Sequence, residues 1–156
     1  MKKRGGSVYG LEFTQENLLI YGKLMEKLTA GLKGYENFIV KESDSAKAFR
    51  SGSLAVLATP VLIASAEETC ADLVQPLLDE GLGTVGTRVD IRHLAPTPIG
   101  MKYHCECELT GVEGRKLLFS VTLYDEKEQI AEGTHERFII NEERFFTKAQ
   151  NKAAKA

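Results

Sequence analysis

The 156-residue chain lacks the features that mark several classes of protein. It has no tryptophan, only three histidines, and a formal net charge at pH 7 of −2. No apolar run is long enough to cross a bilayer, and no apolar stretch of a secretory signal follows the basic start Met1–Gly6. The near-neutral charge gives no overall attraction to nucleic acid or to an anionic membrane surface. We therefore expect a soluble cytoplasmic protein that binds neither nucleic acid nor membrane.

The chain also lacks the motifs that hold metals and common cofactors. Its three cysteines do not form a Cys/His cluster with zinc spacing, so no metal site is expected. Cys105 and Cys107 are two residues apart in a predicted strand, where their side chains share a face and are expected to pack as small apolar groups. No phosphate-binding loop, dinucleotide-binding glycine motif or serine-nucleophile motif is present, and we expect no cofactor.

The stretch from Thr59 to Leu78 predicts one long apolar helix. Thr59 can cap the first turn, and Pro60 suits the first helical position because no N–H is missed there. Pro76 is expected to bend or end the helix. At about 100° per residue, one third of the circumference is apolar; it consists of Leu62, Ile63, Ala66, Cys70, Leu73, Val74 and Leu77.

Glu67 lies at the edge of this apolar arc. A carboxylate in that position must find a partner, take up a proton or face a cavity. The alternative interpretation is a boundary residue whose side chain reaches solvent. The pattern alone leaves both open.

The remaining chain alternates in a way that predicts strands. A strand is expected over residues 35–41, a short helical turn up to Phe49, and four strands over 84–94, 101–109, 115–124 and 129–140. One helix followed by an antiparallel meander excludes a doubly wound parallel sheet. The prediction is an α+β hotdog fold, in which an antiparallel sheet wraps around the central helix.

The predicted domain spans residues 35–144. Residues 1–34 are expected to form an appendage with an amphipathic helix over 14–32, whose apolar stripe includes Leu28 and Leu32. Residues 145–156 form a tail, and the whole Lys/Ala-rich stretch 142–156 is expected to be frayed.

Three polar residues stand in apolar surroundings and are candidates for chemistry: Thr59, Glu67 and His93. His135, in the last predicted strand, competes with His93. A single histidine in a strand is more often a packed or surface residue than a catalytic one.

Three motifs resemble those of hotdog-fold thioesterases of the fluoroacetyl-CoA thioesterase type. They are L-A-T-P-x6-E-E over Leu57–Glu68, V-G-T-R-V-D-I-R-H-L-A-P-T-P-I-G-M over Val85–Met101, and E-G-T-H-E-R over Glu132–Arg137. The resemblance covers residues 34–144. It implies an acyl-CoA thioesterase that works as a homodimer or a dimer of dimers.

The resemblance also implies roles for individual residues. Thr59, Glu67 and His93 correspond to the catalytic set, and Gly86, Arg137 and Phe49 are the substrate-binding candidates. The fluoroacetyl-specific enzymes carry a phenylalanine-lined lid before the central helix. In this chain Phe49 is the only aromatic residue in that run, which argues against such a lid. A general short-chain acyl-CoA is therefore expected as substrate. The candidates for holding the CoA phosphates are Arg88, Arg92, Lys102 and Arg115.

The chemistry at these residues keeps several alternatives. His93 can act as a general base or protonate the departing thiolate. Glu67 can orient a water molecule or attack the thioester directly to give an anhydride. A non-hydrolytic acyl-CoA-binding protein and a hotdog dehydratase or hydratase are the alternative functions.

Overall fold

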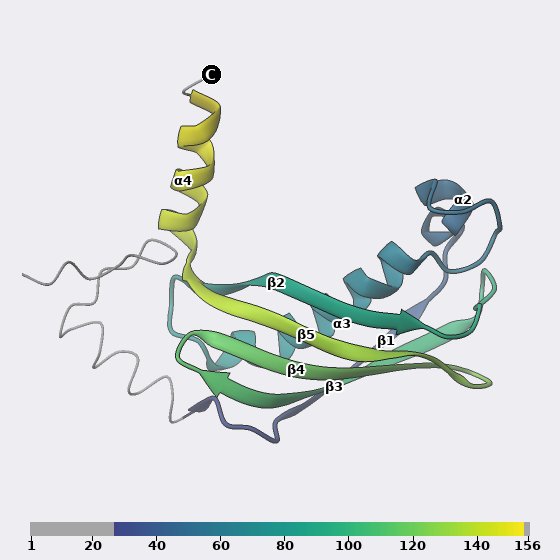
Figure 1. Cartoon of the computed structure of the whole chain (residues 1–156), viewed down its shortest axis with the longest axis horizontal. Helices are drawn as coiled ribbons and strands as arrows, with labels where there is room; N and C mark the ends of the chain where they lie inside the picture. The colour runs from purple at the N-terminus through teal and green to yellow at the C-terminus, as the bar shows by residue number, and fades with distance from the viewer. Residues whose placement is uncertain (1–26, 155–156) are drawn as a thin grey trace, which may run out of the picture.

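The computed structural model describes residues 27–154, which form one antiparallel sheet around a central helix. The sheet has the strand order β1-β3-β4-β5-β2. Figure 1 shows the curved sheet with helix α3 running across one of its faces. The strands are β1 (Lys33–Ile39), β2 (Leu82–His93), β3 (Lys102–Glu113), β4 (Lys116–Asp125) and β5 (Gln129–Asn141). The helical elements are η1 (Glu42–Asp44), α2 (Ala46–Phe49), α3 (Thr59–Val74), η2 (Gln75–Leu77) and α4 (Glu142–Ala154). The predicted hotdog arrangement is confirmed.

The core lies between α3 and the face of the sheet that it covers. From α3, Leu62, Ala66, Cys70 and Val74 are buried, and alternate residues of β3 and β4 meet them. All three cysteines are free and buried, which confirms that Cys105 and Cys107 pack as small apolar groups. Because each large aliphatic side chain contributes about 1.5–3 kcal/mol when fully buried, this layer holds α3 in place.

The start of α3 differs from the sequence prediction. Ala58 is the N-cap residue and Thr59 is the first helical residue, with Pro60 following it. No side chain caps the helix, so the prediction that Thr59 acts as the cap is wrong. The shift by one residue frees the Thr59 hydroxyl for another partner.

Strand β2 forms one edge of the sheet and carries a bulge. Its pairing with β5 shifts register between Gly86 and Arg88, so Thr87 is an extra residue on β2. A bulge bends the strand and changes the direction of neighbouring backbone groups. The stretch 86–90 around it is exposed.

The predicted N-terminal helix lies largely outside the described residues. In the described part, residues 28–32 are not helical, so the prediction that the helix reaches Leu32 is wrong. Gly31 has a φ of 100° and turns the chain into β1, with its N–H donated to the Leu109 carbonyl. Leu28 is nevertheless buried, and Leu32 packs against the core.

The C-terminal stretch is helical, so the prediction of a frayed tail is wrong. Helix α4 begins after Asn141, whose side-chain oxygen accepts a hydrogen bond from the Arg144 backbone N–H. Glu142 and Glu143 in the first turn and Lys152 in the last turn complement the helix dipole. Figure 1 shows α4 projecting from one end of the sheet, and its side chains are exposed.

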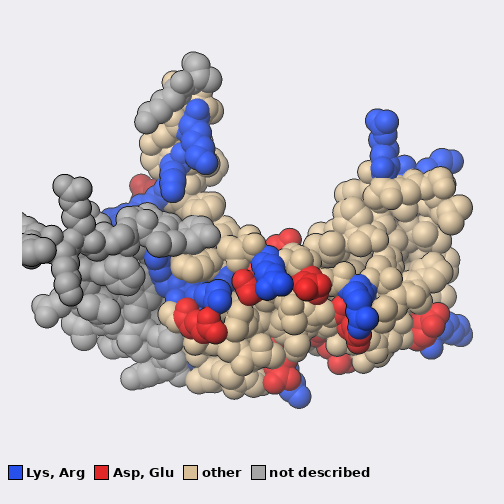
Figure 2. Space-filling model, in the orientation of Figure 1, with Lys and Arg blue, Asp and Glu red and all other residues tan. Residues whose placement is uncertain are grey.

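The described surface mixes charges of both signs. Figure 2 shows Lys and Arg side chains beside Asp and Glu side chains along the sheet. Within residues 27–154 no helix is long and apolar enough to span a membrane.

Candidate active site

The end of the sheet at which β2 finishes holds a threonine–histidine pair. Thr59 is the first residue of α3 and His93 is the last residue of β2, and the Thr59 Oγ1 and His93 Nδ1 atoms are 2.9 Å apart. Both residues line a shallow pocket of about 340 Å³, together with Ala46, Ser51, Val56, Leu57, Leu94, Ala95 and Pro96. A hydroxyl hydrogen-bonded to an imidazole is an arrangement in which protons can be exchanged.

His93 is suited to work as an uncharged base. Burial lowers its pKa below the ordinary value of 6.5, and the Ala95 backbone only partly offsets this effect. Its Nε2 atom is buried and makes no hydrogen bond within residues 27–154. A buried polar atom without a partner is costly, so Nε2 is the ring atom that still needs a partner which residues 27–154 do not supply.

A second polar cluster surrounds Glu67 further along α3. The Glu67 Oε2 atom accepts a hydrogen bond of 3.1 Å from Arg137 Nη1 and lies 3.8 Å from His135 Nε2. Arg137 also donates to Thr84, from Nε to the hydroxyl oxygen at 2.8 Å and from Nη2 to the backbone carbonyl at 3.0 Å. The Arg137 side chain is 8% exposed, whereas that of Glu67 is 39% exposed. Glu67 therefore has a buried cationic partner and one accessible side. It is not a boundary residue whose side chain only reaches solvent.

Gly86 leaves room for the Glu67 carboxylate. A Cβ atom built on Gly86 would overlap Glu67 Oε2 and would lie 3.2 Å from both the Glu67 carboxyl carbon and His135 Cε1. Glycine is needed here because of this close approach.

The two polar clusters are separate within one chain. Among residues 27–154, no hydrogen bond joins Glu67 to Thr59 or His93. Eight residues of helix place Thr59 and Glu67 about 12 Å apart along the axis. Within a single chain the Thr59 hydroxyl therefore does not hold the Glu67 carboxylate.

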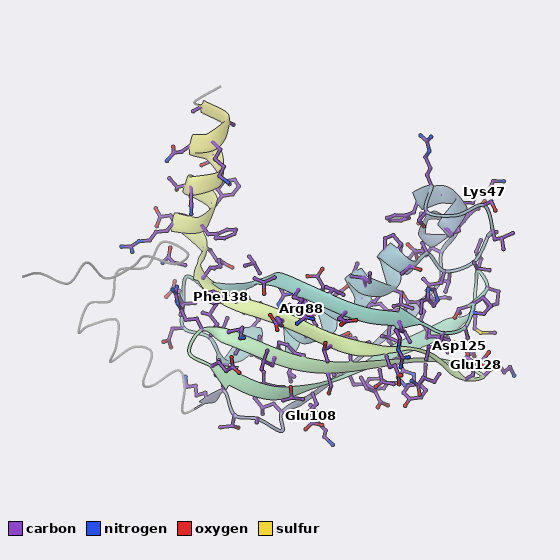
Figure 3. All side chains as sticks on the ribbon, in the orientation of Figure 1. Lys47, Arg88, Glu108, Asp125, Glu128 and Phe138 are labelled. Carbon is purple, nitrogen blue, oxygen red and sulfur yellow. The ribbon has the colours of Figure 1, made fainter. Side chains whose placement is uncertain are left out.

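The remaining candidates are spread over the molecule. Phe49, in α2, is 52% exposed and does not line the Thr59–His93 pocket. Arg115 is almost buried, with its guanidinium 5.0 Å from the Phe138 ring centre, so it is poorly placed to meet CoA phosphates. Arg88, Arg92 and Lys102 are exposed; Arg88 lies 3.8 Å from both Asp90 and Glu136, and Arg92 pairs with Glu132. Figure 3 shows Arg88 midway along the sheet and Phe138 near the root of α4.

His135 is the member of the Glu67 cluster that sequence reasoning named only as a competitor of His93. It is buried in β5 beside Arg137, and the alternation of a strand puts these two side chains on the same face. That spacing within E-G-T-H-E-R was the available signal, but only the fold shows that the shared face meets Glu67.

The motifs that build these clusters match a known family. Residues 40–143 match the family described as fluoroacetyl-CoA-specific thioesterase. The chain belongs to that family. It is 37% identical over 97 residues to the fluoroacetyl-CoA thioesterase of Streptantibioticus cattleyicolor, which is 62% of this chain and 70% of that protein.

Solved structures of family members and of more distant proteins have the same fold. One structure of the fluoroacetyl-CoA thioesterase FlK has 30% identity and a TM-score of 0.77, over 80% of this chain and 97% of that chain. A thioesterase-superfamily member from Thermus thermophilus has a TM-score of 0.74 at 22% identity, over 82% of this chain and 97% of that one. The second likeness shows the fold alone.

Proposed function

We propose that this protein hydrolyses short-chain acyl-CoA thioesters to the free acid and CoA, with Thr59, Glu67 and His93 as its catalytic residues. As a member of the fluoroacetyl-CoA-specific thioesterase family, the chain is a thioester hydrolase that acts on acyl-CoA. The observation that carries the proposed site is the 2.9 Å contact between Thr59 and His93, beside a pocket and with an unused, buried Nε2 atom.

The substrate assignment rests on the ligands of solved FlK structures and on the run of residues that precedes α3. Solved FlK complexes hold acetyl-CoA in one case and fluoroacetate with CoA in another. In this chain the run Arg50–Ser53 before α3 is small and polar apart from its arginine, and Phe49 is exposed. We therefore propose general short-chain acyl groups rather than selectivity for fluoroacetyl.

In the proposed reaction, a water molecule attacks the thioester carbonyl carbon and the carbon–sulfur bond breaks. Glu67 orients and polarises the water, since an Arg137 hydrogen bond on Oε2 stabilises the carboxylate and makes it a poorer nucleophile. Neutral His93 takes up the proton that the attacking water loses and then gives it to the leaving thiolate, while Thr59 fixes the imidazole ring through Nδ1. Backbone N–H groups at the β2 bulge near Gly86 are the proposed donors to the oxyanion.

Isotope can reveal the anhydride route, because water that attacks the anhydride at the Glu67 carboxyl carbon leaves its oxygen in Glu67. Many turnovers in isotopically labelled water should put the label into the released acid and none into Glu67. Label in the Glu67 peptide by mass spectrometry would instead assign the direct attack.

We further propose that two copies complete each site. Glu67 lies beside Gly86 in the first half of β2, whereas the Thr59–His93 pair lies at the end of the strand. β2 is an edge strand, and its residues 86–90 are exposed. Two-fold antiparallel pairing of β2 with its copy, centred near Val89 and Asp90, would bring the Gly86 part of one copy to the His93 end of the other. An unpaired strand edge is commonly covered in this way.

A mixing experiment tests this arrangement. Glu67→Gln and His93→Ala proteins are each expected to be inactive. If a site uses Glu67 of one copy and His93 of the other, half of a randomly mixed population has one intact site of two, which restores about a quarter of the wild-type activity. Absence of restoration in a mixture proven to exchange subunits would refute the shared site.

The function itself is tested by thiol release over a panel from acetyl- to octanoyl-CoA and aryl-CoA esters. We expect hydrolysis that falls with acyl length and is lost in Glu67→Gln. Tight binding of CoA esters without thiol release would refute hydrolysis and identify a binding protein. The free buried cysteines suit a reducing compartment, and we propose a cytoplasmic location.

A further inference from the structure

His135 makes two polar contacts in a buried site, and neither is used in the reaction as proposed. Its side chain has no exposed area. Its Nδ1 atom lies 2.8 Å from the Arg88 carbonyl oxygen, and its Nε2 atom lies 3.1 Å from Arg137 Nη1. The Phe119 ring stacks beside the imidazole with centres 6.2 Å apart.

These two contacts determine where the imidazole hydrogen lies. A carbonyl oxygen only accepts, so Nδ1 carries the hydrogen and donates it to Arg88. The Nε2 lone pair is then free to accept from the Arg137 guanidinium, which only donates. The ring must be neutral, because a second N–H would point at a cation.

The charges around the ring agree with this assignment. Burial, together with the charge of Arg137, lowers the pKa of His135, while the Arg88 carbonyl, Glu67 and Glu136 act in the opposite direction. The balance of these groups keeps the imidazole uncharged near neutral pH.

Arg137 depends on this acceptor for its orientation. Thr84 takes hydrogen bonds from Nε and Nη2, and Nη1 donates both to His135 and to Glu67. Both Nη1 hydrogens are therefore used, and the plane of the guanidinium is fixed with one hydrogen directed at Glu67 Oε2. Without an acceptor at position 135, a nearly buried N–H would lose its partner, and only Thr84 and the half-exposed Glu67 would hold the guanidinium, so Nη1 could shift away from its present position.

His135 also connects this cluster to the bulge in β2. Arg88, whose carbonyl it contacts, follows directly after the extra residue of the bulge, and Gly86 precedes that residue. We propose that neutral His135 is a positioning residue that holds Arg137, and through it the Glu67 carboxylate, in register with the Gly86 bulge. This inference rests on the proposed role of Glu67 in hydrolysis.

Three substitutions separate the two contacts. His135→Leu removes both, His135→Asn keeps a donor near the Nδ1 position, and His135→Gln places an acceptor oxygen near the Nε2 position. The first readout is the Arg137 Nε–H signal in a nitrogen-labelled NMR spectrum, which a fixed guanidinium shows as a slowly exchanging peak. The second is kcat and KM with acetyl-CoA, or with the best substrate of the panel.

We expect His135→Leu to broaden or abolish the Arg137 signal and to lower kcat by up to about 100-fold, as misplacement of a catalytic group does, with little change in KM. His135→Gln should restore most of both readouts, and His135→Asn should restore neither. Thr69→Val, which removes a buried hydrogen bond from the Thr69 hydroxyl to the Ser65 carbonyl elsewhere on α3, is the control for general loss of packing and should leave kcat unchanged.

Each result decides the question. An unchanged Arg137 signal and kcat in His135→Leu would overturn the proposal, as would equal losses in the Gln and Asn variants. If His135→Leu does not fold, the Gln–Asn comparison still decides. If the Arg137 signal follows the expected order but the wild-type protein hydrolyses no acyl-CoA, the positioning role stands and the proposed function fails.

Discussion

Replacing Gly86 by alanine tests whether close approach of backbone and carboxylate sets the reactivity of the site. The added Cβ would overlap Glu67 Oε2 and lie 3.2 Å from His135 Cε1, tighter than ordinary van der Waals contact. Glu67 is half-exposed and can swing away, whereas His135 is buried and cannot. We therefore expect the carboxylate to leave Arg137.

The structure predicts a large effect on rate and a small one on stability. A charge-assisted hydrogen bond contributes about 1.5–3 kcal/mol when buried, but the exposure of Glu67 reduces this to about 1 kcal/mol. Replacing glycine by alanine recovers roughly 0.4–1 kcal/mol through the unfolded chain, since Gly86 does not have a positive φ. The free energy of unfolding should thus change by less than about 1 kcal/mol, while kcat/KM falls about 100-fold.

The assay compares thiol release and denaturant unfolding of Gly86→Ala with those of Gly111→Ala. Gly111 is another strand glycine, and the nearest atom that an added Cβ there would meet is the flexible Cδ1 end of Leu118, at 3.1 Å. The control should keep the wild-type rate. Wild-type kcat/KM in Gly86→Ala, or a rate loss matched by global unfolding, would refute the reasoning.

Three other perturbations have defined outcomes. Thr59→Ser should keep most of the activity, and Thr59→Val should lower kcat by more than about 10-fold, because only serine keeps a hydroxyl for His93. Both variants should lose little stability, because Ala58 and not Thr59 is the N-cap; equal kcat values would contradict a role for the hydroxyl. Stability should fall as the pH drops below 6.5, because the unfolded chain takes up protons on His93 and His135 that the folded protein, with both pKa values lowered, does not; in denaturant titrations, His135→Gln should weaken this pH dependence below pH 6.5, whatever its effect on stability at neutral pH. Truncation after Arg144 should leave the domain folded by circular dichroism with nearly unchanged Tm, since α4 is exposed beyond that point, and a large drop in Tm would show that α4 has a partner in solution.

Local patterns were sufficient for much of the fold. The alternation in β3 and β4 and the apolar arc of α3 identified the strands, the central helix and the buried cysteines, because periodicity reports directly which side chains face a core. Predictions at element ends were less accurate. The N-cap is Ala58 and not Thr59, and residues 28–32 are not helical. Residues 142–154 form a helix because Asn141 caps it and the stretch is rich in good helix formers.

For the site, the sequence identified unusual residues, and the tertiary structure identified their partners. The sequence by itself determined that Glu67 is out of place on an apolar arc and that His93 and His135 sit in strands. Only the tertiary structure decided which groups meet: His93 contacts Thr59, whereas Glu67 contacts Arg137. The physical reason is that these pairs are 34 and 70 residues apart along the chain, and a contact at that distance depends on sheet register and the position of the helix. The neutral state of His135 was decided there too, because it follows from one carbonyl and one guanidinium that folding brings to opposite sides of its ring.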